Sequence, residues 1–343
     1  GENLVRFASL VTSGGYPAAR MGAVFGAKRC KAVVVVGSVP GSDYLVDAYR
    51  ALIPTNPLTL SQHTPPGFGT WPSAELEGYF SATGFDPREF MSHLTRSTGG
   101  CPGCPQDCMK SFDGTPLHQQ AVAAFTGLGI HDLSTVLALN TRCVRWGVDP
   151  VSLAGVLAYR CSVPGGPSFG DVPALLALAS DVVSRRSVLA EGVARASRVL
   201  GGEEHAMHCK GIELPVFDPR GNQGLALSFA VHPLGPRYDG VEHDIDFDPV
   251  WGQPQFVRNA GLPSPLPMDS LTDTKVDLVA DLMELWSGYD AVGVCLFAAP
   301  PTRNLTEATA ADLVSAVTGR TVTPSDIRSL GRQRLQLMLD YNL

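Results

Sequence analysis

Hydrophobic and polar positions alternate in a way that predicts a mainly helical chain from Pro116 onward. Apolar side chains recur every three or four residues over residues 133–137 and 151–157, the spacing of one helix face. Asp171 can cap a further helix, because a short polar side chain at this position accepts a hydrogen bond from the first turn. We expect its apolar face to extend over residues 175–193.

The last third of the chain predicts two more helices. Residues 273–286 form an amphipathic pattern that we expect Gly288 to stop, since glycine commonly ends helices. Near the C-terminus, Thr323-Pro324-Ser325-Asp326 has a cap, a proline at the first helical position and an acid three residues after the cap. Residues 211–270 show neither the helical spacing of apolar residues nor the alternation of a strand, so we expect irregular structure there.

The first hundred residues lack this helical pattern. We expect a helix or loop, a glycine- and alanine-rich turn over residues 14–26, and one buried strand that ends at Gly37. Residues 40–100 are rich in proline and predict loops. The predicted fold class is therefore mainly α, a multihelical two-domain array with a small α/β remnant at the N-terminus.

Composition narrows the functional classes. Of the 343 residues, 44% are hydrophobic and 17% are charged, which allows a large core and excludes a disordered chain. The net charge of −7, without a basic block, argues against nucleic acid as a partner. The longest aliphatic run, residues 174–179, is too short to span a membrane. We expect a cytoplasmic protein that binds no nucleic acid and no membrane.

The cysteines carry most of the chemical information. Three of the eight, Cys101, Cys104 and Cys108, lie in one turn-rich stretch where Pro102 and Pro105 oppose a regular helix. Three clustered thiolates and one distant cysteine commonly hold an iron–sulfur cluster. Zinc would use the same ligands, usually as two separate pairs. We favour a cluster, with zinc or unligated thiols as the alternatives.

The fourth ligand has five candidates. Cys143 and Cys161 lie in apolar helical patterns and are typical of small core residues. Cys30 precedes the predicted strand, and Cys209 lies in a predicted loop. Cys295 follows a predicted helix end, a context that favours it modestly.

Several motifs, in order, resemble the aldehyde ferredoxin oxidoreductase family of tungsten- or molybdenum-pterin enzymes. The resemblance covers essentially the whole chain. Its motifs are residues 1–9, 21–28 and 31–33, the three-cysteine stretch 101–108, Gly129-Ile130, Asn140, Gly147-Val148-Asp149, Lys210–Pro215, Asp218–Gly221, Asp290–Cys295 and 319–342.

The resemblance implies specific ligands. Cys101, Cys104, Cys108 and Cys295 would hold one [4Fe–4S] cluster. Asp290 would accept hydrogen bonds from an amine of a bound pterin, since a carboxylate suits a guanidine-like edge; an exposed loop carboxylate is the alternative. The resemblance also implies a tungsten or molybdenum bispterin. Within the family's pterin-contacting motifs, Gly293, Asp149 and Gly147 are the other residues that would bind the pterins.

The resemblance also implies an activity and partners. The chain would oxidise an aldehyde to a carboxylic acid and pass electrons through the cluster to ferredoxin or a similar carrier. Residues 1–42 would be the remnant of an N-terminal pterin-binding domain, 43–208 a helical domain with the three-cysteine stretch, and 209–343 a second helical domain with the fourth cysteine. Most of the N-terminal domain is absent, so a separate chain that supplies it is an expected partner; a homodimer is the alternative.

The sequence departs from the family at cofactor and catalytic positions. The glycine-rich turn reads Tyr16-Pro-Ala-Ala-Arg20, Val144 stands in place of an aspartate, and Gln119 in place of a glutamate that would move a proton. These changes support an alternative: a pterin-free member that keeps the cluster or metal for structure, electron transfer or partner binding.

The family's histidine after the central signature is replaced by a polar run, which we define as residues 235–247. A histidine flanked by two carboxylates suits a general acid. We therefore predict His243, Tyr238 and Glu242 as catalytic residues for proton transfer. A solvated acidic loop is the alternative reading.

Overall fold

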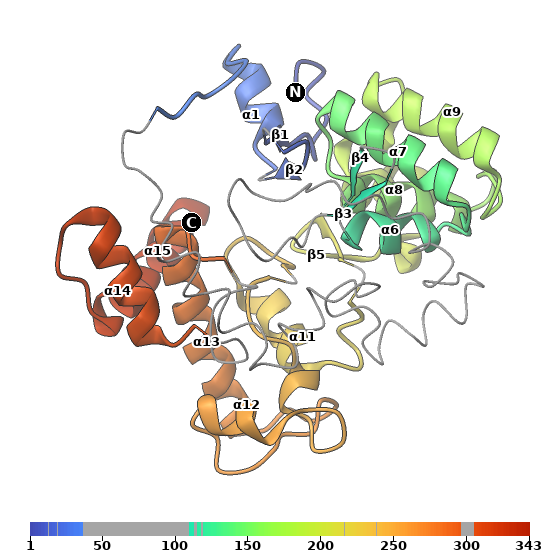
Figure 1. Cartoon of the computed structure of the whole chain (residues 1–343). Coiled ribbons are helices and arrows are strands. Elements are labelled where there is room, and N and C mark those ends of the chain that lie inside the picture. Colours follow the sequence, from blue (N-terminus) through green and yellow to red (C-terminus); the bar gives the residue numbers. More distant parts are fainter. Residues whose placement is uncertain are drawn as a thin grey trace. The chain divides into compact units, whose positions relative to one another are not determined.

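The computed structural model describes residues 1–36, 110–295 and 305–343, except for residues 13, 19, 113, 114, 118, 216 and 238. Helices dominate these residues and strands are short (Figure 1), which confirms the predicted mainly α fold class. The described residues up to 215 belong to one compact unit and those from 217 onward to another. The predicted divisions after residues 42 and 208 stay predictions. No helix in the described ranges combines the length and hydrophobicity that crossing a bilayer requires.

The first unit consists of helices and three separate antiparallel strand pairs. The pairs are β1 (Leu10–Val11) with β2 (Pro17–Ala18), β3 (Lys110–Phe112) with β4 (Thr115–Leu117), and β5 (His208–Cys209) with β6 (Ile212–Glu213). The helices are α1 (Gly22–Ala27), α6 (Gln119–Thr126), α7 (Leu133–Trp146), α8 (Pro150–Ser162), α9 (Val172–Val183), η2 (Val188–Glu191), α10 (Val193–Leu200) and η3 (Glu203–His205).

Aspartates begin three consecutive helices of this unit. Asp132, Asp149 and Asp171 each accept a hydrogen bond from the backbone N–H three residues later, at the start of α7, α8 and α9. The predicted cap at Asp171 is confirmed. The helix it starts ends at Val183 and does not continue to residue 193 as expected. Arg185 adopts a left-handed conformation with φ +58°, which breaks the helix.

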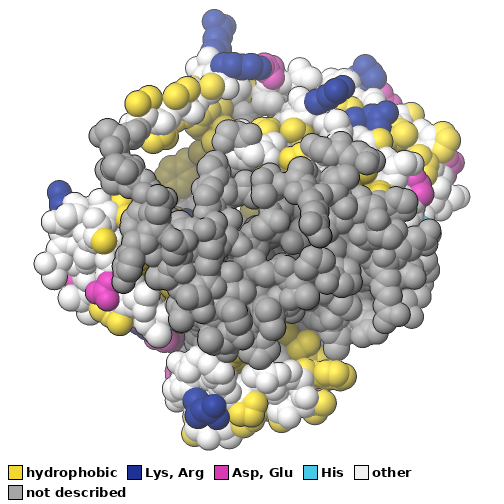
Figure 2. All heavy atoms as spheres, viewed as in Figure 1, with side chains coloured by type: hydrophobic (Ala, Val, Ile, Leu, Met, Phe, Trp, Pro, Cys, Tyr) yellow, Lys and Arg dark blue, Asp and Glu magenta, His cyan; other side chains and the backbone are white. Residues whose placement is uncertain are grey.

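The predicted buried strand before Gly37 is wrong. Residues 31–36 are assigned to no strand, and Val33, Val34, Val35 and Val36 expose 67%, 82%, 89% and 90% of their surface. They form the row of hydrophobic side chains at the upper left of Figure 2. A β-branched run becomes a buried strand only where neighbours pair with it, and no described strand does so.

The second unit contains α11 (Gln223–Val231), η4 (Asp244–Phe247), α12 (Pro254–Asn259), α13 (Asp273–Val292), α14 (Glu307–Thr318) and α15 (Pro324–Asn342). Helices α11 and α12 correct the prediction that residues 211–270 are irregular. Seven of the nine residues of α11 are apolar or glycine, so the segment lacks the polar face from which periodicity is recognised.

Helix α13 is longer than predicted. It passes through Gly288 and ends at Gly293, which adopts φ +80°. A side chain at Gly288 would overlap the backbone of Ile327 on α15. The glycine therefore serves close helix packing and does not end the helix. The predicted start of α15 is confirmed: Thr323 and Asp326 form a capping box.

Candidate functional site at the end of α13

Three predicted site residues lie near the C-terminal end of α13. Asp290 occupies the last turn of the helix, Gly293 ends it, and Cys295 follows in an exposed position. The predicted ligands Cys101, Cys104 and Cys108 lie outside the described residues. Within the described ranges, no three His, Cys, Asp or Glu side chains gather as they would around a metal ion. The proposed ligand set therefore stays a prediction.

Two arginines hold the carboxylate of Asp290. Its Oδ2 lies 3.4 Å from Nη1 of Arg237 and 3.4 Å from Nη1 of Arg334. Oδ1 accepts no hydrogen bond from the described residues, and the side chain is 40% exposed. Burial raises the pKa of Asp290 above its ordinary value; Arg237 and Arg334 oppose this shift, while Asp239 adds to it.

The polar run supplies Arg237 together with its nearest partner. Arg237 donates from Nε and Nη2 to the two oxygens of Asp239 at 2.8 and 2.6 Å, a forked pair. Burial raises the pKa of Asp239, but the charge of Arg237 and its hydrogen bonds to the carboxylate, with smaller contributions from nearby groups, together hold the pKa below its ordinary value. Part of the predicted polar run is thus an ordered ion-pair chain that leads to Asp290. No pattern in the sequence indicated that Arg334, 44 residues further along the chain, would pair with Asp290.

The rest of the polar run is largely buried. His243 packs edge-on against Phe217, with ring centroids 4.4 Å apart, and Glu242 is buried. Asp244, one of the two carboxylates that flank His243 in the sequence, lies in the core. It accepts from the N–H groups of Gly224 and Leu225 at the start of α11 and pairs with Lys275 at 2.9 Å. The reading of this run as a solvated loop is therefore wrong for Asp244.

Tyr238 lies outside the described residues. His243, Glu242 and Tyr238 as proton-transfer residues stay predictions. Gln119 begins α6, and its side chain also lies outside the described part of the chain.

The first unit holds the other predicted pterin-binding positions. Gly147 ends α7 with φ +62°, and its carbonyl accepts from the N–H of Ser9 at 2.7 Å. Asp149 caps α8 through Oδ2, which also lies 3.3 Å from Nη2 of Arg20. The side chain of Arg20, in the turn where the family has glycines, therefore meets a carboxylate expected to face the pterin.

Sequence reasoning missed the role of Glu213, which lies in the motif Lys210–Pro215. Its side chain is buried at the start of α10, and Oε1 accepts from the N–H of Val193 at 2.8 Å. Side chains at Gly155 or Gly192 would crowd it, with Cβ atoms 3.0 and 2.9 Å from its atoms. The motif therefore anchors a helix terminus in the first unit.

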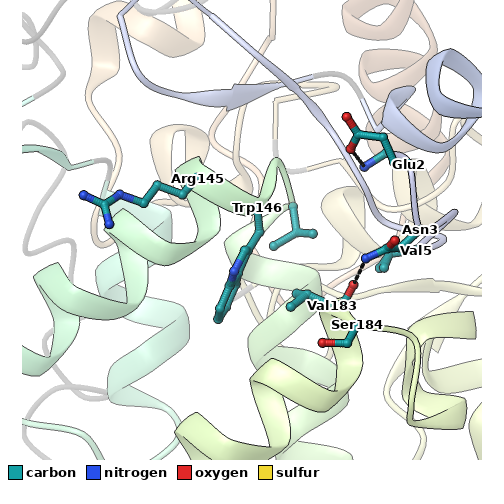
Figure 3. A pocket seen from close by; sticks show the side chains of 9 residues that line it. Glu2, Asn3, Val5, Arg145, Trp146, Val183 and Ser184 are labelled. Atoms are coloured by element: carbon teal, nitrogen blue, oxygen red, sulfur yellow. Dashed lines mark hydrogen bonds and ion pairs between the residues drawn. The ribbon is translucent and has the colours of Figure 1, made fainter. Parts of the chain in front are cut away.

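A cavity of about 270 Å³ is lined by Trp146 and Val148, the neighbours of Gly147, but not by Gly147 itself. Figure 3 shows this cavity from close by. Residues 1–3, the end of α7 and the end of α9 line it. Asn3 donates to the carbonyl of Val183 at 2.9 Å, Trp146 extends into the opening, and Arg145 turns away from it. None of the predicted site residues lines this cavity.

Comparison with known proteins identifies the family. Residues 68–343 match the family described as aldehyde ferredoxin oxidoreductase, domains 2 and 3. Relatives from Thermococcus kodakarensis, Pyrococcus furiosus and Pyrococcus horikoshii, each called tungsten-containing aldehyde ferredoxin oxidoreductase, are 26% identical to the chain. These alignments cover 97% of the chain and 60% of each relative, so the chain spans about 60% of their length. The chain therefore belongs to the aldehyde ferredoxin oxidoreductase family.

Proposed function

We propose that the chain is the cluster-carrying part of an oxidoreductase that converts an aldehyde to a carboxylic acid. The reaction combines an aldehyde with water and releases two protons and two electrons, the electrons passing to ferredoxin or a similar carrier. The observation that supports this proposal most is the end of α13. There, an accessible carboxylate and an exposed thiol, Asp290 and Cys295, lie within five residues of each other.

The donor set at this helix end fits the groups that the family implies. Oδ1 of Asp290 can accept from a pterin amine, because no described residue engages it. Cys295 is exposed and can reach a ligand. A tungsten or molybdenum bispterin would supply two-electron redox chemistry, and a [4Fe–4S] cluster bound by Cys101, Cys104, Cys108 and Cys295 would carry single electrons.

The chain's own residues would bind and orient these groups and move protons. In this proposal Asp290, Gly293, Asp149 and Gly147 contact pterin. His243, with Glu242 and Tyr238, takes up the proton released when water-derived oxygen adds to the aldehyde carbon. Positioning of this kind is the protein's usual contribution in cofactor enzymes.

Iron content after anaerobic purification tests the cluster. We expect about four irons per chain and a broad visible absorbance that bleaches with dithionite. Cys295→Ser should lower the iron content, whereas Cys143→Ser, a change at a buried cysteine of α7, should leave it intact. Zinc without iron would contradict the cluster, and equal losses in both variants would contradict Cys295 as the ligand.

One observation favours the pterin-free alternative. Arg20, in the turn where the family has glycines, pairs with Oδ2 of Asp149, the oxygen that also caps α8, so an arginine side chain lies against a carboxylate predicted to contact pterin. In this second proposal the cluster serves structure, electron transfer or partner binding. Purified protein that contains iron but no pterin, even with the family's first domain present, would favour it.

A further inference from the structure

The carboxylate of Asp290 lies where an unassisted negative charge is unfavourable. The last turn of a helix carries unpaired carbonyl groups and the negative end of the helix dipole, so a carboxylate there is repelled. Asp239 adds a second negative charge nearby. Something must offset these effects if Asp290 is to stay ionised and fixed.

Close packing of α13 and α15 brings one cation to this position. A side chain at Gly331 of α15 would overlap the carbonyl oxygen of Glu284, so the two backbones approach directly at this glycine. Arg334 lies three residues later on the same helix face. Its Nη1 reaches Oδ2 of Asp290 at 3.4 Å and Oγ of Ser287 at 3.2 Å.

The polar run brings the second cation. Arg237 uses Nε and Nη2 for Asp239 and offers its remaining terminal nitrogen, Nη1, to Asp290. The fork fixes the plane of the guanidinium, so the direction of Nη1 is fixed as well. Arg237 and Arg334 thus approach the same oxygen of Asp290 from two different segments.

We propose that Arg237 and Arg334 are positioning residues for Asp290: they hold its Oδ2 and leave Oδ1 available to a donor of a bound ligand. The ligand class, a cyclic guanidine-like edge such as that of a pterin, rests on the proposed function. The positioning itself does not, because it concerns only groups within this chain.

The ionisation of Asp290 tests the proposal directly. Carbon-13 NMR of aspartate-labelled protein follows its carboxyl resonance, which Asp290→Asn identifies by its loss. We expect Arg237→Gln to raise the pKa of Asp290 by about one unit or more, the usual effect of losing an adjacent opposite charge. Arg334→Gln should raise it less, because only the loss of Arg237 also leaves Asp239 uncompensated.

A matched control lies on the same helix. Arg332 of α15 pairs with Glu284 of α13 at 3.0 Å, so Arg332→Gln removes an ion pair between the same two helices without touching Asp290. It should leave the pKa of Asp290 unchanged. Arg334→Lys, which keeps the charge, should give a pKa closer to that of the parent than Arg334→Gln does.

The proposal is overturned if Arg237→Gln and Arg334→Gln leave the pKa of Asp290 where Arg332→Gln leaves it. Pterin content, measured by fluorescence after oxidative release, separates this result from the proposed function. If the pKa rises as expected while parent and variants all lack pterin, the positioning holds and the pterin-dependent function fails. If parent protein contains pterin, both arginine variants should retain less of it than Arg332→Gln.

Discussion

Individual carboxylates in this chain serve very different purposes, and their surroundings decide which. Asp244 and Glu213 are buried at helix starts, where backbone N–H groups or a lysine compensate their charge. Asp290 lies at a helix end, remains 40% exposed and keeps one oxygen without a described partner. Only the last arrangement leaves a carboxylate able to bind something else.

Glu213 can be tested by its effect on stability. Glu213→Ala removes the acceptor for the N–H of Val193 and leaves a buried donor unsatisfied, so we expect a loss of about 1–3 kcal/mol in the free energy of unfolding. Urea denaturation measures it. Glu203→Ala, at an exposed position, should change stability by less than about 0.5 kcal/mol. Similar losses in both variants would contradict the anchoring role.

The predicted proton donor His243 can be tested by its effect on turnover. If the holoenzyme oxidises aldehydes, His243→Ala should lower kcat by about a hundredfold or more while the iron content stays unchanged. Tyr238→Phe removes only the hydroxyl and tests the rival donor. Full activity in both variants would show that the polar run moves no proton and serves structure alone.

At the scale of elements, the glycines of α13 and α15 decide how closely these helices pack. Gly331→Ala should raise the intrinsic helix preference, yet its methyl group would overlap the carbonyl oxygen of Glu284. Overlap in a packed contact costs about 1–3 kcal/mol, more than the gain of about 1 kcal/mol in propensity, so we expect net destabilisation. Thermal and urea unfolding measure the difference.

Gln333→Ala, an exposed change on the same helix, is the control and should be nearly neutral. A Gly331→Ala variant as stable as Gln333→Ala would mean that α13 and α15 can separate without cost. The same pair of variants tests the geometry that brings Arg334 to Asp290, because a wider spacing should also raise the pKa of Asp290.

Across the whole molecule, charge is unevenly distributed. Residues 217–343 contain 16 acidic and nine basic side chains, whereas residues 1–216 contain 17 of each. The entire net charge of −7 therefore arises in the second part of the chain. These counts include buried groups such as Asp244 and Lys275, but the exposed acidic side chains among them would repel an acidic electron carrier.

We expect aldehyde oxidation to depend on the family's first domain as well as on the domains that this chain matches. Because the family match begins at residue 68 with domains 2 and 3, and the relatives are longer, aldehyde oxidation with a viologen dye should require the family's first domain. Adding or co-expressing that domain should produce activity. Aldehyde oxidation at an enzymatic rate by the isolated chain would refute this expectation.

Features that depend on local chemistry could be predicted from the sequence. Helix starts such as Asp171 and Thr323–Asp326 were predictable, because a cap acts on residues only three positions away. The family was recognisable because its motifs keep their order and spacing along the chain.

Features that depend on partners distant in the sequence become visible only in the folded chain. Gly288 reads as a helix stop, yet it lies inside α13 because α15 packs against it. Val33–Val36 read as a buried strand, yet remain exposed because no described strand pairs with them. Arg237 and Arg334 meet at Asp290 although 97 residues separate them, since ion pairs depend on distance in space and leave no periodic signal in the sequence.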